Sequence, residues 1–259
     1  MATEVPSSFD WRRGPTGVAL HTTALDPLAT HIFTTRERAF RGPDASADYA
    51  ELARHFDILP NAIVTVAQVH GRGVVTVRPR QSIDERAEAD AIVSFDPERA
   101  IAVRVADCVP ILIADRRGRA VAAIHAGWRG TCARVAAETV GVMNDAGIDP
   151  GSLVAGVGPS IGACCYQVDD RVRLAFLSMT PDAAAWFSED GPGRWRLDLW
   201  QANRDQLEDA GIPSEQIHVS GVCTADHLDR CFSYRKEGAG TGRMVAAIRL
   251  DGHPLDVRT

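Results

Sequence analysis

The chain of 259 residues is long enough for one large domain or two small ones. Hydrophobic residues make up 45% of it and charged residues 24%, and no apolar run approaches the roughly 20 residues that a membrane-spanning helix needs. The composition therefore excludes a helix that crosses a membrane. The formal net charge of -6 argues against a nucleic-acid binder that depends on general attraction to phosphate, because that mode needs a basic excess.

The cysteines and the N-terminal sequence indicate a reducing compartment. Residues 1–14, MATEVPSSFDWRRG, have neither the basic start nor the apolar stretch of a secretory signal. Six cysteines in such a chain are better interpreted as thiols, ligands or nucleophiles than as a disulfide framework. The sequence contains no CxxC pair, which is the signature of a zinc ribbon. We therefore expect a cytoplasmic protein, in which Cys164 and Cys165 are packed thiols rather than ligands.

The first half of the chain predicts one helix followed by a sheet. Because no repeat or linker divides the chain, a single domain over residues 1–259 is expected. Residues 45–56 have apolar side chains at helical spacing, which predicts an amphipathic helix capped by Asp44 or Ser46. Residues 63–124 hold short runs rich in Val and Ile, which predict a substantial sheet. The runs are IVTVAQV, VVTV, ADAIVSF, IAVRVA, ILIAD and VAAI.

The second half predicts both helices and strands. Residues 131–143 change to a helical period with Gly147 just past the end, and residues 171–179 and 199–210 also predict helices. Later strands are expected in LVAGVG, QIHVSGV and MVAAIRL. Because the early strands cluster without regular alternation with helices, the pattern favours an α+β fold with mixed or antiparallel sheets over a doubly wound fold.

Three potential metal ligands stand at the ends of predicted strands. His70 closes one apolar run, Cys108 follows another, and His125 closes a third. Two imidazoles and one thiolate suit zinc and leave a fourth position for water, as in catalytic zinc sites. The same atoms also suit a cysteine nucleophile, with Cys108 as the thiolate and His125 as its base. The spacing leaves both alternatives open, and Asp107 is a candidate partner that orients a histidine.

Basic and glycine-rich turns are candidate anion sites. Arg129 stands at the start of the helix predicted after GWRG, where free backbone N–H groups and the helix dipole favour a phosphate or a carboxylate. The stretch GPSIGACCYQV brings Ser160 and Tyr166 to a candidate pocket lining. The stretch FSYRKEGAGTGR brings Arg235 and has the composition to grip an anion.

With QVHG, ADCVPIL, IHAGWRG, GPSIGACCYQV and CTADHLDRCFSYRKEGAGTGR in this order, the sequence resembles the family named variously purine nucleoside phosphorylase, laccase-domain or polyphenol oxidase, and peptidoglycan editing factor. The resemblance runs over about residues 33–248. It implies a single α+β domain of layered mixed β-sheets with flanking helices. It also implies a zinc ion on His70, Cys108 and His125, phosphorolysis of adenosine, inosine, guanosine and methylthioadenosine, and adenosine deamination.

The resemblance implies a nucleoside and phosphate as partners. Charge and composition predict neither nucleic acid nor membrane as a partner, and the sequence indicates no obligate protein partner. We expect Arg129 to hold phosphate, with help from Arg36 or Arg235. After Arg36 the sequence reads ERAFRGPDASADYA, where the family usually carries a Gly-Gly turn and a Ser-Leu-Asn stretch, so the base or sugar preference stays open. The other candidate substrate-binding residues are Gln68, Asp107, Ser160 and Tyr166.

The laccase name predicts copper, but the histidines argue against a multicopper centre. Multicopper oxidases bind their trinuclear centre through His-x-His pairs, and the eight histidines, at positions 21, 31, 55, 70, 125, 218, 227 and 253, form no such pair. The H-x-E and P-C-x-x-C motifs of the usual zinc deaminases are also absent from the sequence. Two alternatives to phosphorolysis remain: an amidase that removes serine from a UDP-muramoyl precursor, and a metal-binding interaction module.

Overall fold

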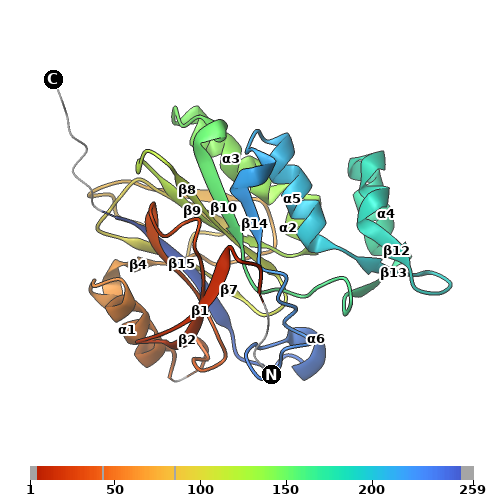
Figure 1. The fold of residues 1–259 in the computed structure, drawn as a ribbon, viewed down its shortest axis with the longest axis horizontal. Helices are drawn as coiled ribbons and strands as arrows, with labels where there is room; N and C mark the ends of the chain where they lie inside the picture. The colour runs from red at the N-terminus through yellow and green to blue at the C-terminus, as the bar shows by residue number, and fades with distance from the viewer. Residues whose placement is uncertain (1–4, 43, 85, 252–259) are drawn as a thin grey trace.

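The structure, a computed structural model, describes residues 5–42, 44–84 and 86–251. The two ends of the predicted domain, residues 1–4 and 252–259, lie outside the described residues. Two six-stranded sheets form the centre of the molecule, and helices cover their outer faces (Figure 1).

The first sheet joins strands from both ends of the chain. Its neighbours pair antiparallel, except for the parallel pair β4 and β7. In spatial order the strands are β1 (Phe9–Gly14), β2 (Gly17–Thr22), β3 (Ala29–Thr34), β15 (Met244–Leu250), β7 (Ala100–Val105) and β4 (Ile63–Val64). The late strand β15 therefore lies between two early ones.

The second sheet is mixed. Its four central strands pair antiparallel, and a parallel strand is added at each edge. In spatial order the strands are β14 (Ile217–Val219), β10 (Leu153–Val157), β8 (Val109–Asp115), β9 (Val121–Ala126), β6 (Ala91–Ser94) and β5 (Val74–Val77). A small antiparallel sheet follows the order β11 (Gln167–Asp169), β13 (Arg194–Leu197) and β12 (Phe187–Glu189).

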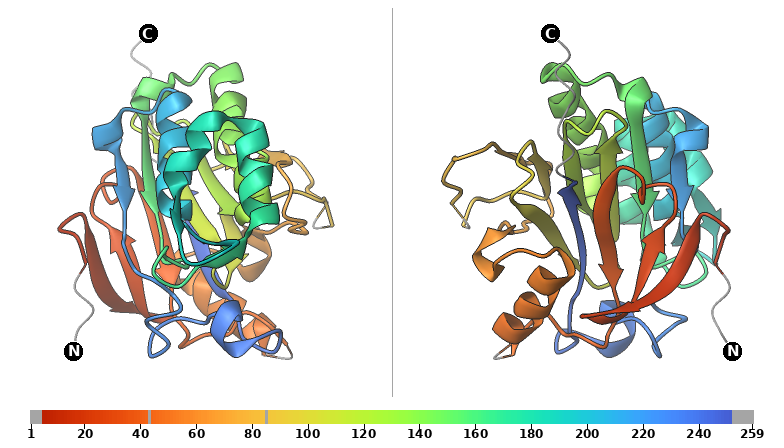
Figure 2. Two further views of the ribbon diagram at one scale, coloured as in Figure 1. Left: turned by 90° about the vertical axis from the view of Figure 1, so that its right-hand side faces the viewer. Right: turned by 60° about the vertical axis from the view of Figure 1, so that its left-hand side comes forward.

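Helices lie on opposite sides of the two sheets (Figure 2). On the outer face of the first sheet lies α1 (Ala45–His55). The outer face of the second sheet packs against α3 (Val135–Asp145) and α5 (Leu199–Asp209), and α4 (Asp170–Met179) extends the same apolar core beside the small sheet. Two short helices are α2 (Trp128–Cys132) and α6 (Tyr234–Glu237). Single 3-10 turns occur at Pro60–Ala62, Pro150–Ser152, Pro181–Trp186 and Ser214–Gln216.

Strand β8 shows how these layers are held together. Its residues Val109, Ile111 and Ile113 belong to the core between the second sheet and the helices. Leu112 and Ala114 belong to the core between the two sheets, since successive side chains point to opposite faces of a strand. A strand buried on both faces reads as a continuous apolar run, as ILIAD does. The predicted α+β fold of layered mixed β-sheets with flanking helices is confirmed.

Two local predictions were wrong, and a third was right only in part. The run IVTVAQV forms a strand only over Ile63–Val64. The single helix predicted over residues 131–143 is divided into α2 and α3, because Arg134 has a φ of 63°, in the left-handed region that ends a right-handed helix. At α1, Asp44 occupies the N-cap position but its side chain makes no capping hydrogen bond, and Ser46 lies inside the helix.

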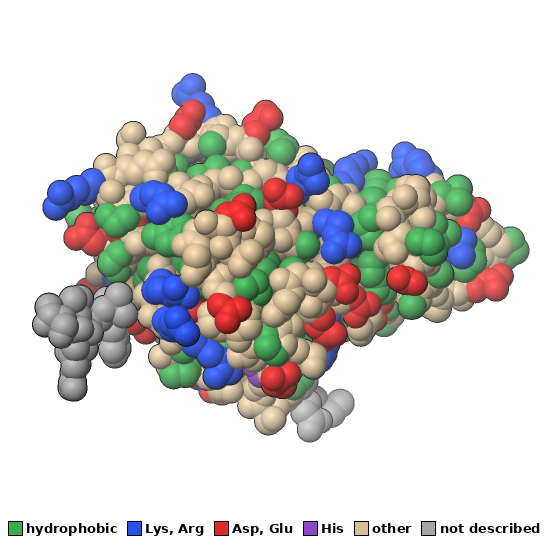
Figure 3. Space-filling model, turned by 90° about the horizontal axis from the view of Figure 1, so that it is seen from above, with side chains coloured by type: hydrophobic (Ala, Val, Ile, Leu, Met, Phe, Trp, Pro, Cys, Tyr) green, Lys and Arg blue, Asp and Glu red, His purple; other side chains and the backbone are tan. Residues whose placement is uncertain are grey.

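The surface agrees with the mixed charge of the sequence. On the face shown in Figure 3, Lys and Arg side chains occur among Asp and Glu side chains, and several of the basic side chains lie next to one another at the lower left. Within the described ranges, no helix is both long enough and apolar enough to cross a membrane.

A buried histidine in β3 is held in its neutral form. The two ring nitrogens of His31 face opposite partners: Nδ1 lies 3.1 Å from the carbonyl oxygen of Ala29, and Nε2 accepts from the backbone N–H of Thr22 at 2.9 Å. One nitrogen must donate and the other must accept, which a protonated ring cannot do. Burial lowers the pKa of His31 to about 4 and that of neighbouring His21 to about 3.

We therefore expect acid to destabilise the protein as the pH falls from about 6.5 to about 4. In this window the unfolded chain binds a proton at His31 and the folded protein does not, so stability is highest above about pH 6.5. Between about pH 7.5 and about pH 5, this one group should cost roughly 2 kcal/mol of unfolding free energy. Urea unfolding at the two pH values should show a smaller pH difference in His31→Gln, and an unchanged difference would contradict the prediction.

Candidate active site

A cavity of about 740 Å³ collects residues from distant parts of the chain. Its volume lies within the range of small-molecule pockets. The residues that line it include Arg41, Gln68, His70, Arg104, Asp107, Cys108, His125, Gly127, Trp128, Arg129, Tyr166, Tyr234, Arg235 and Arg243. All three predicted metal ligands are among them, and so are five of the seven predicted substrate-binding residues.

The three predicted ligands converge in this cavity. The ligand atoms of His70, Cys108 and His125 lie within 4.8 Å of one another. The two imidazole rings have their centroids 4.9 Å apart, with 75° between the ring planes. His125 comes from β9, Cys108 from the bend between β7 and β8, and His70 from an irregular loop after β4.

The loop that carries His70 is held by a carboxylate. His70 does not end a strand, as its sequence pattern predicted; it lies in a bend with a φ of 60°, in the left-handed region. The backbone N–H groups of Val69, His70 and Gly71 donate to the carboxylate of Asp90 at 3.3, 3.0 and 2.6 Å. These three bonds hold a backbone conformation that a non-glycine residue rarely adopts.

The same carboxylate orients the second histidine. Asp90 is fully buried, and its Oδ1 lies 2.7 Å from Nδ1 of His125. The backbone N–H of His125 also donates to the carbonyl oxygen of Asp90 at 2.7 Å. With Nδ1 committed to Asp90, Nε2 of His125 is the nitrogen left for a ligand. A carboxylate that holds a metal-binding histidine in this way fixes its tautomer and its orientation.

Sequence reasoning assigned the orienting role to the wrong aspartate. The carboxylate of Asp107 accepts instead from the hydroxyl of Thr224 at 2.6 Å and from the backbone N–H of Arg235 at 2.7 Å. Asp107 thus ties two loops of the cavity wall together. The signal for Asp90 was present in the sequence, because an acidic residue at the start of the apolar run ADAIVSF must find a partner when the strand is buried.

The thiol and the imidazole shift each other's protonation. Burial raises the pKa of Cys108, but His125 and His70 outweigh it, so that the pKa falls to about 6. Burial lowers the pKa of His125, but Cys108 and Asp90 outweigh it and raise that pKa to about 9. Near neutral pH the pair therefore favours a thiolate, which is the form of cysteine that binds metal or attacks an electrophile.

The residues fit a zinc ion. In a tetrahedral zinc site with Zn–S near 2.3 Å and Zn–N near 2.0 Å, ligand atoms lie about 3.3–3.8 Å apart, a separation that these three side chains reach with small adjustments. Gly127 leaves room for this convergence: a Cβ there would lie 2.8 Å from Sγ of Cys108 and 3.1 Å from Cδ2 of His70. This contact is why a glycine follows the His-Ala pair in IHAGWRG.

Gly127→Ala is expected to weaken zinc binding about 10-fold, the lower end of the effect of disturbing groups that orient metal ligands. The added methyl group must push Cys108 or His70 away from its present position. Gly141→Ala, within α3, is the matched control because its Cβ meets nothing within 4 Å. The control should gain roughly 0.5–1 kcal/mol of stability and keep its zinc affinity. Equal zinc affinities in a chelator competition assay for both variants would contradict this prediction.

Five guanidinium groups line the cavity around the three ligands. They belong to Arg41, Arg104, Arg129, Arg235 and Arg243, while Asp107 supplies the one carboxylate among the described lining residues. Burial lowers the pKa of Arg243, and the positive charges of Arg41 and Arg104 lower it further. Such an accumulation of like charge is relieved when an anion binds between the groups.

Three of these arginines, Arg41, Arg104 and Arg243, were not predicted from the sequence. Arg104 had a visible signal, as the one charged residue in the strand run IAVRVA. Its backbone N–H and carbonyl pair with the side chain of Gln68 at 2.9 and 2.8 Å. Arg243 is the last residue of the stretch FSYRKEGAGTGR. This stretch was predicted to bind an anion, but only Arg235 was named in it. Arg41 carried no distinguishing pattern.

Two predicted substrate-binding residues do not line the cavity. The guanidinium of Arg36 bonds the carboxylate of Glu237 at 2.9 Å and the carbonyl oxygens of Leu228 and Cys231. The buried hydroxyl of Ser160 accepts from the indole N–H of Trp200 at 2.6 Å. Both side chains hold neighbouring segments together, and the predicted contacts with substrate gain no support from this placement.

Arg129 lines the cavity, but not as the helix-terminal anion site that the sequence predicted. Helix α2 begins at Trp128 and is only five residues long. The guanidinium of Arg129 stacks over the ring of Trp128 at 4.5 Å, and that of Arg235 lies 5.1 Å from the ring of Tyr166. The anion-binding capacity of this wall therefore comes from its guanidinium groups.

Comparison with known proteins gives the same family as the sequence motifs. Residues 43–251 match the family model described as multi-copper polyphenol oxidoreductase laccase. Purine nucleoside phosphorylase YfiH of Escherichia coli (strain K12) is 38% identical over 192 residues, which cover 74% of this chain and 75% of the relative. A purine nucleoside phosphorylase of Bacteroides thetaiotaomicron is 31% identical over 246 residues, which cover 85% of this chain and 91% of the relative.

Solved structures share the fold as well as the sequence. The hypothetical protein YfiH of Bacillus licheniformis superposes with a TM-score of 0.84 at 28% identity, over 93% of this chain and 99% of that one. YlmD of Geobacillus stearothermophilus also gives a TM-score of 0.84, at 30% identity over 95% of this chain and 99% of that one. The chain therefore belongs to this laccase-like family, whose curated relatives are named purine nucleoside phosphorylases.

Proposed function

We propose that the protein is a zinc-dependent purine nucleoside phosphorylase acting on adenosine, inosine, guanosine and methylthioadenosine. The observation that carries the proposal is the convergence of His70, Cys108 and His125 in a cavity lined by five arginines. An anion site positions the attacking phosphate, and a metal bound beside it would supply Lewis acidity to the same cavity. The names of the relatives support the same activity.

The arginines are assigned to phosphate. In phosphorolysis a phosphate oxygen forms a bond to the anomeric carbon of the ribose, while the bond from that carbon to the base nitrogen breaks and its electron pair leaves with the base. Arg129 and Arg235 lie on the cavity wall close to the aromatic rings, and Arg41 and Arg243 line the same cavity, where the charge of Arg41 contributes to lowering the pKa of Arg243. Guanidinium groups bind phosphate oxygens in pairs and hold them in a fixed direction.

The aromatic side chains are assigned to the base. Trp128, Tyr166 and Tyr234 line the cavity and offer apolar faces on which a purine stacks. Burial, and next the charge of Cys108, raise the pKa of Tyr166, so its hydroxyl remains a hydrogen-bond donor at neutral pH. This combination of faces and donors suits a purine ring better than a sugar alone.

His70, Cys108 and His125 would hold the zinc ion, and Asp90 keeps the imidazole of His125 directed at it. Zinc with three protein ligands supplies Lewis acidity at its remaining coordination position. We propose adenosine deamination as a second activity of the same cavity. Copper is not proposed, because the sequence lacks the His-x-His pairs of a trinuclear centre. All six cysteines are free, which supports a reducing, cytoplasmic setting.

Product analysis tests the proposal. Purified protein is incubated with adenosine in the presence and absence of phosphate, and the products are separated by chromatography. Adenine and ribose-1-phosphate should appear only when phosphate is present, whereas inosine should appear in both reactions if the protein also deaminates. If neither adenine nor inosine formed under either condition, the nucleoside phosphorylase proposal would be rejected.

A second candidate activity follows from the number of arginines. Five guanidinium groups exceed what a single phosphate requires, and a diphosphate-linked substrate would use more of them. This favours, as the alternative, an amidase that releases serine from a UDP-muramoyl-serine precursor, as a peptidoglycan editing factor would. Serine release from that precursor, without turnover of adenosine, would support the alternative over phosphorolysis.

A further inference from the structure

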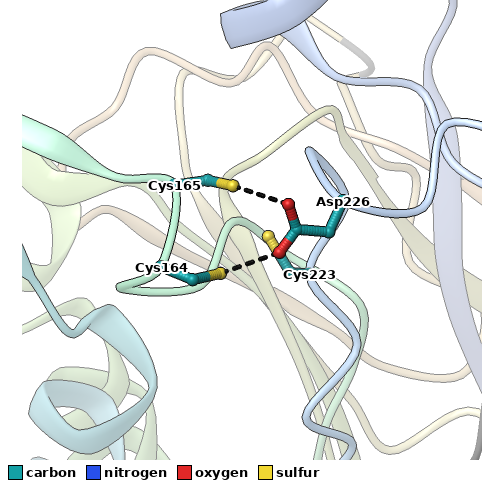
Figure 4. Close-up of side chains that lie close together, drawn as sticks. All are labelled: Cys164, Cys165, Cys223 and Asp226. Carbon is teal, nitrogen blue, oxygen red and sulfur yellow. Dashed lines mark hydrogen bonds between the residues drawn. The ribbon is translucent and has the colours of Figure 1, made fainter.

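A second group of potential metal ligands lies outside the cavity described above. Sγ of Cys164, Cys165 and Cys223 and a carboxylate oxygen of Asp226 all lie within 4.8 Å of one another. Figure 4 shows the thiols of Cys164 and Cys165 directed at Asp226, with Cys223 beside them. The expectation that Cys164 and Cys165 are packed thiols is wrong for Cys164, which is exposed. Cys165 is half-buried and packs against a small apolar cluster, and both thiols donate to Asp226, at 3.1 and 2.9 Å.

Backbone hydrogen bonds hold the two loops that carry these side chains. The N–H of Ser160 donates to the carbonyl of Val222 at 3.1 Å, and the N–H of Thr224 donates back to Ser160 at 3.0 Å. Within the first loop, the N–H of Cys165 bonds the carbonyl of Gly162 at 3.0 Å, and Gly162 itself donates to Sγ of Cys223 at 3.3 Å. The four side chains are therefore brought together by the fold rather than by chance proximity of two unconnected loops.

We propose that Cys164, Cys165, Cys223 and Asp226 form a second zinc site, separate from the one in the cavity and closed by four protein ligands. Three thiolates and a carboxylate fill a tetrahedral zinc shell, which is the arrangement of structural sites. Sulfurs in such a shell lie about 3.8 Å apart, so small rotations of side chains already within 4.8 Å complete it. The thiol protons that now point at Asp226 leave to solvent as the metal binds.

The site would fasten part of the cavity wall. The hydroxyl of Thr224, one residue after Cys223, donates to Asp107, which precedes the cavity ligand Cys108. Tyr166, one residue after Cys165, lines the cavity directly. Loss of the second zinc should therefore loosen the wall that contacts substrate, and should raise KM for the nucleoside more than it lowers kcat.

A third group of candidate metal ligands consists of His21, Asp26 and His31. Strong hydrogen bonds already occupy ligand atoms of this group. The two carboxylate oxygens of Asp26 each accept a hydrogen bond from a terminal nitrogen of the Arg12 guanidinium, at 2.9 and 2.5 Å. Both ring nitrogens of His31 face backbone partners. In the cysteine group the hydrogen bonds that the thiols donate are weak, because S–H is a weak donor. A cation can therefore replace these bonds more easily than those of the third group.

Metal counting tests the second site without reference to activity. The full chain is stripped with a chelator under reducing conditions and titrated with zinc, and bound zinc is measured by elemental analysis after buffer exchange. The wild type should retain two zinc ions per chain. Cys223→Ser and Asp226→Ala should each retain one, Cys108→Ser should also retain one, and the double variant Cys108→Ser/Cys223→Ser should retain none. Cys132→Ser, which changes a half-buried thiol in α2, is the control and should retain two.

Cobalt substitution identifies the ligands of each ion. The charge-transfer absorption of cobalt thiolates increases with the number of thiolate ligands, so Cys108→Ser, which keeps the three-cysteine site, should absorb more strongly than Cys223→Ser. The proposal is overturned if the reduced wild type retains only one zinc, or if the second zinc survives in both Cys223→Ser and Asp226→Ala. It is also overturned if the isolated protein holds a disulfide among these cysteines and the reduced protein takes up no second zinc.

Discussion

Cys108→Ala is expected to lose the zinc of the cavity and to lower kcat/KM for adenosine phosphorolysis by more than about 100-fold. Changes to groups that only orient a metal ligand already cost about 10- to 100-fold, and this substitution removes a ligand itself. It also removes one of the two negative charges that raise the pKa of His125 to about 9, and leaves Asp90 as the other. Elemental analysis and steady-state kinetics on the same preparation measure both effects.

The matched control is Cys132→Ala. Its half-buried thiol donates to the carbonyl of Ala175 at 3.4 Å and has no part in the cavity lining. Zinc content and kcat/KM should both stay at the wild-type level in this control. If Cys108→Ala lost its activity but kept its full zinc content, Cys108 would act as a thiolate nucleophile rather than as a ligand.

Asp90→Asn is expected to lower zinc affinity and kcat/KM by about 10- to 100-fold. One carboxylate now serves three backbone N–H groups around His70 and Nδ1 of His125. An asparagine keeps a single acceptor oxygen, and its amide nitrogen would face one of these donors. The substitution therefore disturbs two of the three ligands without touching the metal.

Asp96→Asn separates this positioning role from a general effect of changing a buried aspartate. Asp96 is 2% exposed and accepts from the backbone N–H of Glu98 at 2.9 Å, but it lies outside the cavity. The control should lose stability in thermal unfolding while its zinc affinity stays unchanged. If the two variants lost equal stability and neither lost zinc affinity, Asp90 would be a structural residue only.

The layers of the fold were predictable because they follow from side-chain pattern. Runs such as ILIAD and VAAI place apolar side chains on both faces of the strand, because the second sheet is buried on both faces. Helices α4 and α5 were predicted to within a residue or two of their observed limits, because their apolar side chains follow helical spacing rather than the alternation of a strand. The break at Arg134 was not predictable, because no glycine or proline marks it.

The three candidate metal ligands were predictable as residue types, but their surroundings were not. His70, Cys108 and His125 stand out because each is a polar residue beside an apolar run. Asp90 was missed because its role depends on the pairing of β6 with β9, which places its carbonyl and carboxylate against His125. The cysteine group was missed for the same reason: Cys165 and Cys223 are far apart in the sequence, and only the bridge between Ser160 and Cys223 brings their loops together.

The position of β15 has a consequence for the order in which the molecule assembles. Because Met244–Leu250 pairs with β3 on one side and β7 on the other, the N-terminal strands cannot join the rest of their sheet until β15 has been synthesised. Arg243 immediately precedes this strand and lines the cavity. Contacts between residues so distant in sequence form slowly. A nascent chain on the ribosome therefore carries both candidate histidine ligands long before the lining of the cavity is complete.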